Sequence, residues 1–227
     1  MNLPSNTIPY LLGSIATLVI GIKSLQNYRR LKTPLSRHFA FSGFLAAAGL
    51  GLYSIPFYLT SNPDVLRISV TMGRLCLDIV GYWQIYLIWY LTGLRRFPLS
   101  YLVVPIALIG IVGFVDQALY FQTNPVGIID GLAVYKFSDF AKYIHMISLM
   151  IVFVAGVIIG INAFQQTELR SRVRLLSISI LYVFASMADS YNTLFLQGLN
   201  NSWIVLAGFI IAAGVFLSTT LIFSRNR

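Results

Sequence analysis

The sequence has few of the residues that cover the surface of a soluble protein. Only 10% of its 227 residues are charged, and just seven are acidic. An ordinary soluble domain has about 25% charged residues. Hydrophobic residues make up 57% of the chain, and the mean hydropathy is +0.78. So few charges cannot coat an aqueous surface of this size, which excludes a soluble enzyme and a disordered protein.

Cysteine and histidine are also scarce. The single cysteine, Cys76, excludes an intrachain disulfide and a cysteine-based metal site. The two histidines, His38 and His145, argue against histidine-rich metal chemistry. Neither a glycine-rich phosphate loop nor a His-Glu-x-x-His pattern occurs. We therefore expect no catalytic residues, no metal and no cofactor, and enzyme activity has no support in the sequence.

Long apolar runs dominate what is present. A helix needs about 20 apolar residues to cross a hydrocarbon core of about 30 Å. Backbone polar groups cannot face lipid unpaired, so such runs predict continuous helices. The sequence therefore predicts an all-α, polytopic membrane protein, a single seven-transmembrane-helix bundle over residues 1–227. The seven runs cover approximately residues 8–25, 39–60, 68–94, 101–121, 142–165, 175–197 and 203–223.

Basic residues mark one side of this predicted bundle. Lysine and arginine are enriched in loops that stay in the cytoplasm. One set of loops, with the C-terminal tail, holds twelve basic residues and one acid, whereas the other side and its half of the membrane hold four basic residues and six acids. This asymmetry predicts an N-terminus outside and a C-terminus in the cytoplasm. The twelve are Lys23, Arg29, Arg30, Lys32, Arg37, Arg95, Arg96, Arg170, Arg172, Arg174, Arg225 and Arg227.

The termini and the net charge lead to further expectations. Residues 1–7 are uncharged and lack the basic flank of a cleaved signal peptide, so the first helix is expected to stay in the mature protein. The short loops suit a bacterial inner membrane. A basic cytoplasmic face accounts for the net charge of +9 without nucleic acid as a partner, and it favours contact with anionic lipid.

Polar and ionisable residues inside the predicted helices gather in the outer half of the bilayer. Such residues are costly in lipid and usually face a bundle interior or a cavity. Arg74 and Asp78 are four residues apart and share a helix face, which Tyr82 continues one turn deeper. We expect an outward-facing polar pocket that binds a ligand. Its candidate residues are Arg74, Asp78, Tyr82, Asp116, Gln117, Lys142, His145, Asp189 and Asn192.

A second interpretation of these residues is open. They could be internal salt bridges and hydrogen bonds that hold the bundle together, although such hydrogen bonds average only about 0.6 kcal/mol in membranes. Elsewhere, His38 is expected to be solvated at the cytoplasmic interface, and Gln84 could line the floor of the pocket. The small residues Gly43, Ala47 and Gly51 permit close helix contact.

Several segments resemble the seven-helix membrane-sensing regions found at the N-terminus of some bacterial histidine kinases and related signalling proteins. They are residues 86–93 at the end of the third predicted helix, the loop through Tyr143, residues 169–176 and the polar stretch 189–192. The resemblance implies a sensor. No output domain lies within residues 1–227, so we expect either part of a longer protein or a stand-alone module that acts through a partner.

We therefore expect a membrane sensor or receptor that binds a small molecule or ion in the outer pocket. Its signal would be read at the basic cytoplasmic loops by a cytoplasmic or membrane protein partner. Such a receptor needs different ligand affinities in two helix packings. The alternatives are a small carrier, in which the pocket opens alternately to both sides, and a structural accessory subunit of a membrane complex.

Overall fold

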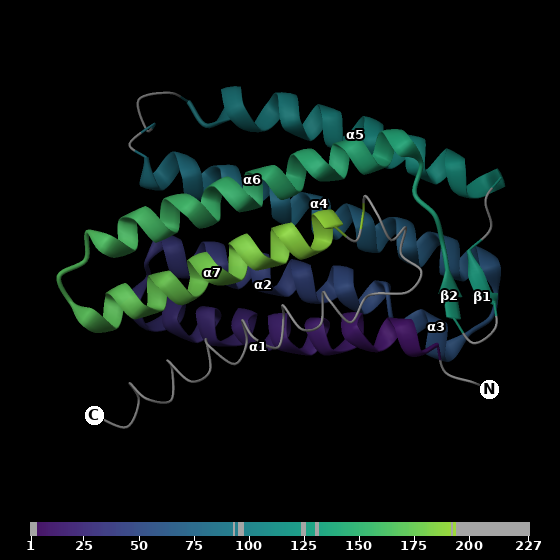
Figure 1. Cartoon of the computed structure of the whole chain (residues 1–227), viewed down its shortest axis with the longest axis horizontal. Coiled ribbons are helices and arrows are strands. Elements are labelled where there is room, and N and C mark those ends of the chain that lie inside the picture. Colours follow the sequence, from purple (N-terminus) through teal and green to yellow (C-terminus); the bar gives the residue numbers. More distant parts are fainter. Residues whose placement is uncertain are drawn as a thin grey trace.

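The structure is a computed structural model, and it describes residues 4–92, 94, 98–123, 126–129, 132–191 and 193. The described chain is mostly helical, as predicted (Figure 1). Its elements in chain order are η1 Ser5–Thr7, α1 Ile8–Leu31, α2 Pro34–Leu52, α3 Ile55–Leu59, α4 Pro63–Leu91, α5 Ser100–Thr123, β1 Gly127–Ile129, β2 Leu132–Val134, α6 Asp139–Phe164 and α7 Leu169–Tyr191.

Five helical segments in the described part are long and apolar enough to cross a membrane, which indicates a multi-pass membrane protein. They correspond to α1, α2 with α3, α5, α6 and α7. The third predicted span forms helix α4, but α4 is not among the five, because polar residues such as Arg74, Asp78 and Gln84 lower its hydropathy. The seventh predicted span, residues 203–223, lies outside the described residues.

The long helices run in alternate directions along the long axis of the molecule (Figure 1). The α1–α2 and α6–α7 connections lie at one end, which we call the basic end because Arg29, Arg30 and Lys32 flank the first of them. The N-terminus, α3 and the two strands lie at the opposite end, which we call the hairpin end. This alternation agrees with the predicted loop order, and the direction of insertion stays a prediction.

Capping residues explain where several helices begin. Thr33, Asn62 and Ser138 precede α2, α4 and α6, and the side chain of each accepts a hydrogen bond from a backbone N–H in the first turn of its helix. Proline occupies the first position of α2 and of α4, where no backbone N–H is needed. The dipeptides Thr33-Pro34 and Asn62-Pro63 therefore act as helix starts.

Glycines allow α1 and α2 to approach closely. A Cβ atom added to Gly43 would lie 2.7 Å from the Cα of Gly21, which leaves no room for any larger residue. Nearby, the Ser14 hydroxyl of α1 donates a hydrogen bond of 2.8 Å to the carbonyl of Ala47. The predicted close contact through the small residues of the second helix is confirmed.

A β-hairpin is the one β-structure in the described residues. Strands β1 and β2 pair antiparallel, with Gly127 opposite Val134, and Asp130-Gly131 separates them in the sequence, a dipeptide typical of two-residue hairpin turns. The Asn6 side chain bonds both the N–H and the carbonyl of Ala133, at 3.0 and 2.9 Å. The hairpin is thereby tied to the start of the chain.

A hydrophobic cluster seats the hairpin on the bundle. It joins the hairpin segment to the end of α2, to α3 and to the start of α4. Its buried members are Tyr53, Phe57, Leu66, Val70, Val126, Ala133 and Tyr135. The long connection between α5 and α6 therefore covers the hairpin end of the bundle and does not project from it.

Candidate functional site

A buried network of charged groups connects α4, α6 and α7. Asp78 of α4 and His145 of α6 are joined by a contact of 2.6 Å between Oδ1 and Nδ1. The other ring nitrogen, His145 Nε2, lies 3.1 Å from Oδ2 of Asp189 on α7. Arg74 Nε lies 3.3 Å from Asp78 Oδ2, one helical turn along α4. We call Arg74, Asp78, His145 and Asp189 the polar network.

The position of His145 determines how the polar network can be protonated. Each ring nitrogen faces a carboxylate oxygen, and a carboxylate only accepts hydrogen bonds. A neutral imidazole has a single N–H, so its other nitrogen would present a lone pair to a second acceptor. The doubly protonated ring donates to both carboxylates. It also balances two positive with two negative charges, whereas the neutral ring leaves one net negative charge.

Close packing of α4 on α6 brings these groups together. A Cβ atom at Gly81 would lie 2.7 Å from the Cβ of Ser148, so the two helices meet almost backbone to backbone. The Ser148 hydroxyl lies 2.8 Å from the carbonyl oxygen of His145 and 3.3 Å from Asp78 Oδ1. Ser148 was not predicted as a site residue, although its spacing of three from His145 places both on one helix face.

Aromatic rings cover the Arg74 side of the polar network. The Arg74 guanidinium carbon lies 4.4 Å from the centre of the Phe137 ring, a cation–π arrangement, and its Nη2 donates to the carbonyl of Ala141 at 3.4 Å. The Arg74–Asp78 contact is an ion pair by distance, but Arg74 Nε lacks the angle of a hydrogen bond. Only 6% of Arg74 is exposed, so its charge depends on these few partners.

The aromatic rings that cover Arg74 belong to the hydrophobic cluster that seats the hairpin, or pack against it. Phe137 packs against Tyr135 and Tyr53, with ring centres 5.6 and 6.4 Å apart. Burial, together with the neighbouring Tyr10 and Tyr53, holds the pKa of the Tyr135 phenol well above its ordinary value. Tyr135 is therefore a neutral part of this cover and contributes no charge to the polar network.

Other predicted site residues lie outside the polar network. Asp116 accepts a hydrogen bond from the Ser138 hydroxyl. Gln117 accepts from the Ser138 N–H at 3.0 Å, and its amide nitrogen lies 3.4 Å from the Lys136 carbonyl oxygen. These two side chains of α5 thus hold the segment that leads into α6 by hydrogen bonds. This segment carries Phe137, the ring that covers Arg74, so Asp116 and Gln117 support the polar network without contacting it.

The last three predicted residues have separate positions. Lys142 forms an ion pair of 2.8 Å with Asp139, whose side chain is largely exposed. The Tyr82 hydroxyl lies 3.4 Å from the carbonyl oxygen of Ile144, beside the polar network. Asn192 lies outside the described residues. Of the nine predicted residues, the structure joins four by direct contacts in one network.

A second buried network lies nearer the basic end. Gln84 Oε1 lies 2.9 Å from His38 Nε2 and accepts a hydrogen bond of 3.0 Å from the Tyr182 hydroxyl. Gln84 Nε2 lies 3.4 Å from the Ser42 hydroxyl. This inner network, formed by His38, Ser42, Gln84 and Tyr182, links α2, α4 and α7. Gln84 therefore bonds His38 and Tyr182 and does not contact the polar network.

The prediction that His38 is solvated is wrong. Only 2% of the residue is exposed, because it lies one turn inside α2 and faces α4. Its ring stacks on Trp83 and Tyr86 of α4, with ring centres 6.0 and 5.5 Å apart. Its Nδ1 atom is buried without a hydrogen-bond partner. Sequence position at the edge of a predicted helix did not reveal which way the ring points.

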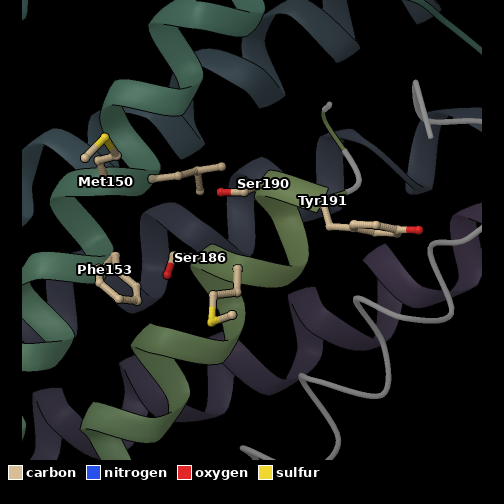
Figure 2. Close-up of a pocket in the computed structure, with 7 residues that line it drawn as sticks. Met150, Phe153, Ser186, Ser190 and Tyr191 are labelled. Carbon is tan, nitrogen blue, oxygen red and sulfur yellow. The ribbon is translucent and has the colours of Figure 1, made fainter. Parts of the chain in front are cut away.

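Two cavities in the described part open on the sides of the bundle. One, of about 360 Å³, lies between α6 and α7. Figure 2 shows Met150 and Phe153 of α6 on one side, with Ser186, Ser190 and Tyr191 of α7 on the other. The second, of about 270 Å³, lies between α4 and α5. Neither cavity is lined by a residue of the polar network.

The donor set of the polar network suits protons better than a metal ion. His145 stands between the two carboxylates and separates them, and in the described residues no three side chains of histidine, cysteine, aspartate or glutamate converge on a point that could hold a metal ion. The chain matches no known protein family, and no characterised protein is detectably similar to it in sequence. The resemblance to histidine kinase sensing regions stays a prediction.

Proposed function

We propose that this protein is a membrane sensor that responds to a proton or another small cation at the polar network. The observation that carries this proposal is the position of His145, with one carboxylate at each ring nitrogen. Gain or loss of a single proton there changes which contacts the α6 side chain can make with α4 and α7. A sensor requires such a difference between two states.

The aromatic cover and the net charge of the polar network both favour a small cation as the stimulus. Phe137 lies directly on Arg74, and His145 is 2% exposed, so the arrangement favours an ion that needs little space. The charged groups that face His145 are Arg74 and Asp78 of α4 and Asp189 of α7. With a neutral ring they sum to one negative charge, which favours a cation over an anion.

The inner network supplies a route by which the change could be read at the other end. Asp189 and Tyr182 are seven residues apart, so both lie on the same face of α7. Loss of the His145–Asp189 contact would release α7 near the hairpin end. A shift of α7 of 1–2 Å, which is of the order of known helix shifts, would then lengthen the Tyr182–Gln84 hydrogen bond. In the proposed orientation a partner reads this change at the cytoplasmic, basic end.

The test measures the fluorescence emission of Trp83 at different pH values, with the full-length protein in lipid nanodiscs. Trp83 reports on the inner network because it stacks on His38. Trp89 and Trp203 are replaced by Phe so that Trp83 is the single reporter. We expect a pH-dependent change in emission that His145→Gln abolishes and Asp139→Asn leaves intact, because the largely exposed Asp139 side chain pairs with Lys142, outside the polar network. An unchanged pH response in the His145→Gln protein would overturn the proposal.

The inner network also favours a second candidate, a small carrier. The polar network and the inner network each hold a buried histidine, His145 and His38. A proton could bind at one histidine and then pass to the other, across the bundle. Proteoliposomes that enclose a pH-sensitive dye separate the two functions. Dye acidification driven by an imposed pH gradient, lost in an Asp78→Asn protein that is shown to be folded, would establish the carrier. A Trp83 response without acidification would establish the sensor.

A further inference from the structure

The cavity between α4 and α5 has a charged end and an apolar body. Arg67 lies at the end toward the start of α4, which is the hairpin end. The rest of the lining follows α4 away from that end and α5 in the antiparallel direction. These further lining residues are Ile68, Thr71, Met72, Phe114 and Ala118.

The surface around this cavity faces the surroundings of the bundle. Ile68 is 60% exposed and Leu119 is 58% exposed, and Met72 and Val115 are also exposed. In a membrane protein such an apolar surface lies against acyl chains. The cavity is therefore a groove on the lipid-facing side of the α4–α5 pair, separate from the polar network.

The charge at the end of the groove has capacity for another partner. Arg67 forms one ion pair, of 3.2 Å through Nη2, with Asp64, and about a third of its side chain remains exposed. A guanidinium has five N–H donors, and two parallel N–H groups match the oxygens of a phosphate. The Thr71 hydroxyl donates to the Arg67 carbonyl at 2.8 Å, which leaves the guanidinium as the principal polar group of the groove.

We infer that this groove binds an anionic phospholipid, with the phosphate on Arg67 and one acyl chain along Ile68, Met72 and Phe114. A basic side chain at the boundary with an apolar channel leading into the membrane complements the two parts of a lipid molecule. The exposed carboxylate of Asp64 opposes the headgroup, so binding is weaker than a lone arginine would give. The inference does not depend on the proposed sensing function, since no residue is shared with the polar network.

The test is native mass spectrometry of the full-length protein in a mild detergent, with phosphatidylglycerol and phosphatidylcholine added separately. We expect phosphatidylglycerol to bind more tightly. Arg67→Gln should weaken it about fivefold, the effect of about 1 kcal/mol for one basic residue near an anionic lipid surface. Lys136→Gln is the matched control, because it removes one exposed positive charge at the same end of the bundle but outside the groove.

Two further variants separate the groove from general charge attraction. Ala118→Phe fills the groove and leaves every charge in place, so it should also abolish the preference for phosphatidylglycerol. Asp64→Asn removes the opposing carboxylate and should strengthen binding. An equal loss of phosphatidylglycerol binding in Arg67→Gln and Lys136→Gln would overturn the inference, because it would show attraction to the overall positive charge and not to the groove. Retained binding in a folded Ala118→Phe protein, or binding of inorganic phosphate as strong as that of the lipid, would also overturn it.

Discussion

Replacing Asp78 with asparagine should destabilise the protein far more than an ordinary polar substitution in a membrane. The carboxylate contacts three groups, Arg74 at 3.3 Å, His145 at 2.6 Å and the Ser148 hydroxyl at 3.3 Å. Asparagine keeps the shape of the side chain and one acceptor oxygen but loses the charge. The Arg74 side chain, 7% exposed, then loses its only direct ion-pair partner in the described residues, and Asp189 is left as the one carboxylate of the polar network.

The magnitude follows from the charge that is left unpaired. Removal of one partner of a buried ion pair costs about 3–5 kcal/mol of the free energy of unfolding. A neutral interhelical hydrogen bond in a membrane averages only about 0.6 kcal/mol, with a maximum of about 1.7. Asp78→Asn is therefore expected in the first range, and Ser148→Ala, which removes only a hydroxyl, in the second.

Reversible unfolding of the purified protein in mixed micelles, with increasing sodium dodecyl sulfate, measures both values. Asp139→Asn serves as the control because it removes a carboxylate that is 86% exposed, and it should change the free energy of unfolding much less than Asp78→Asn does. A loss below about 1 kcal/mol for Asp78→Asn would refute the reasoning, since Arg74 would then have found other partners or water. It would also weaken the case that the polar network is a coupled unit.

Further outcomes test other parts of the structure. Gly43→Ala should destabilise by about 1–3 kcal/mol, because its Cβ would meet the α1 backbone, whereas Gly127→Ala, with nothing within 4 Å, should not change stability. Gln84→Leu should lower the free energy of unfolding by about 1–3 kcal/mol for each buried polar group that it leaves without a hydrogen bond, such as His38 and Tyr182. The ¹⁵N nuclear magnetic resonance signals of His38 should also shift. In the same spectra both ring nitrogens of His145 should carry protons at neutral pH, and a neutral ring would contradict the proposed network. Asn6→Ala should increase hydrogen exchange in the hairpin, because it removes both bonds to Ala133; unchanged exchange would show that the hydrophobic cluster alone holds it.

Local chemistry in the sequence was enough to place most helices. Apolar runs of about 20 residues predict helices whatever their neighbours, because the bilayer forces backbone groups to pair within the segment. Six of the seven predicted runs overlap long helices in the described part, although the second run is divided between α2 and α3, the sixth is described only in part, and α4 is too polar to count as a span by composition. The hairpin was not predicted, since its strands of three residues are too short to show a pattern.

The sequence alone could place Arg74 with Asp78, because residues four apart on a helix must share a face. It could not decide which faces of different helices meet. The meeting faces depend on close packing between helices, such as Gly81 against Ser148, which places His145 between two carboxylates. Asp116, in contrast, bonds Ser138 in the segment before α6. Helical periodicity acts within one segment, whereas contacts between segments depend on the shapes of both surfaces, and only the tertiary structure contains that information.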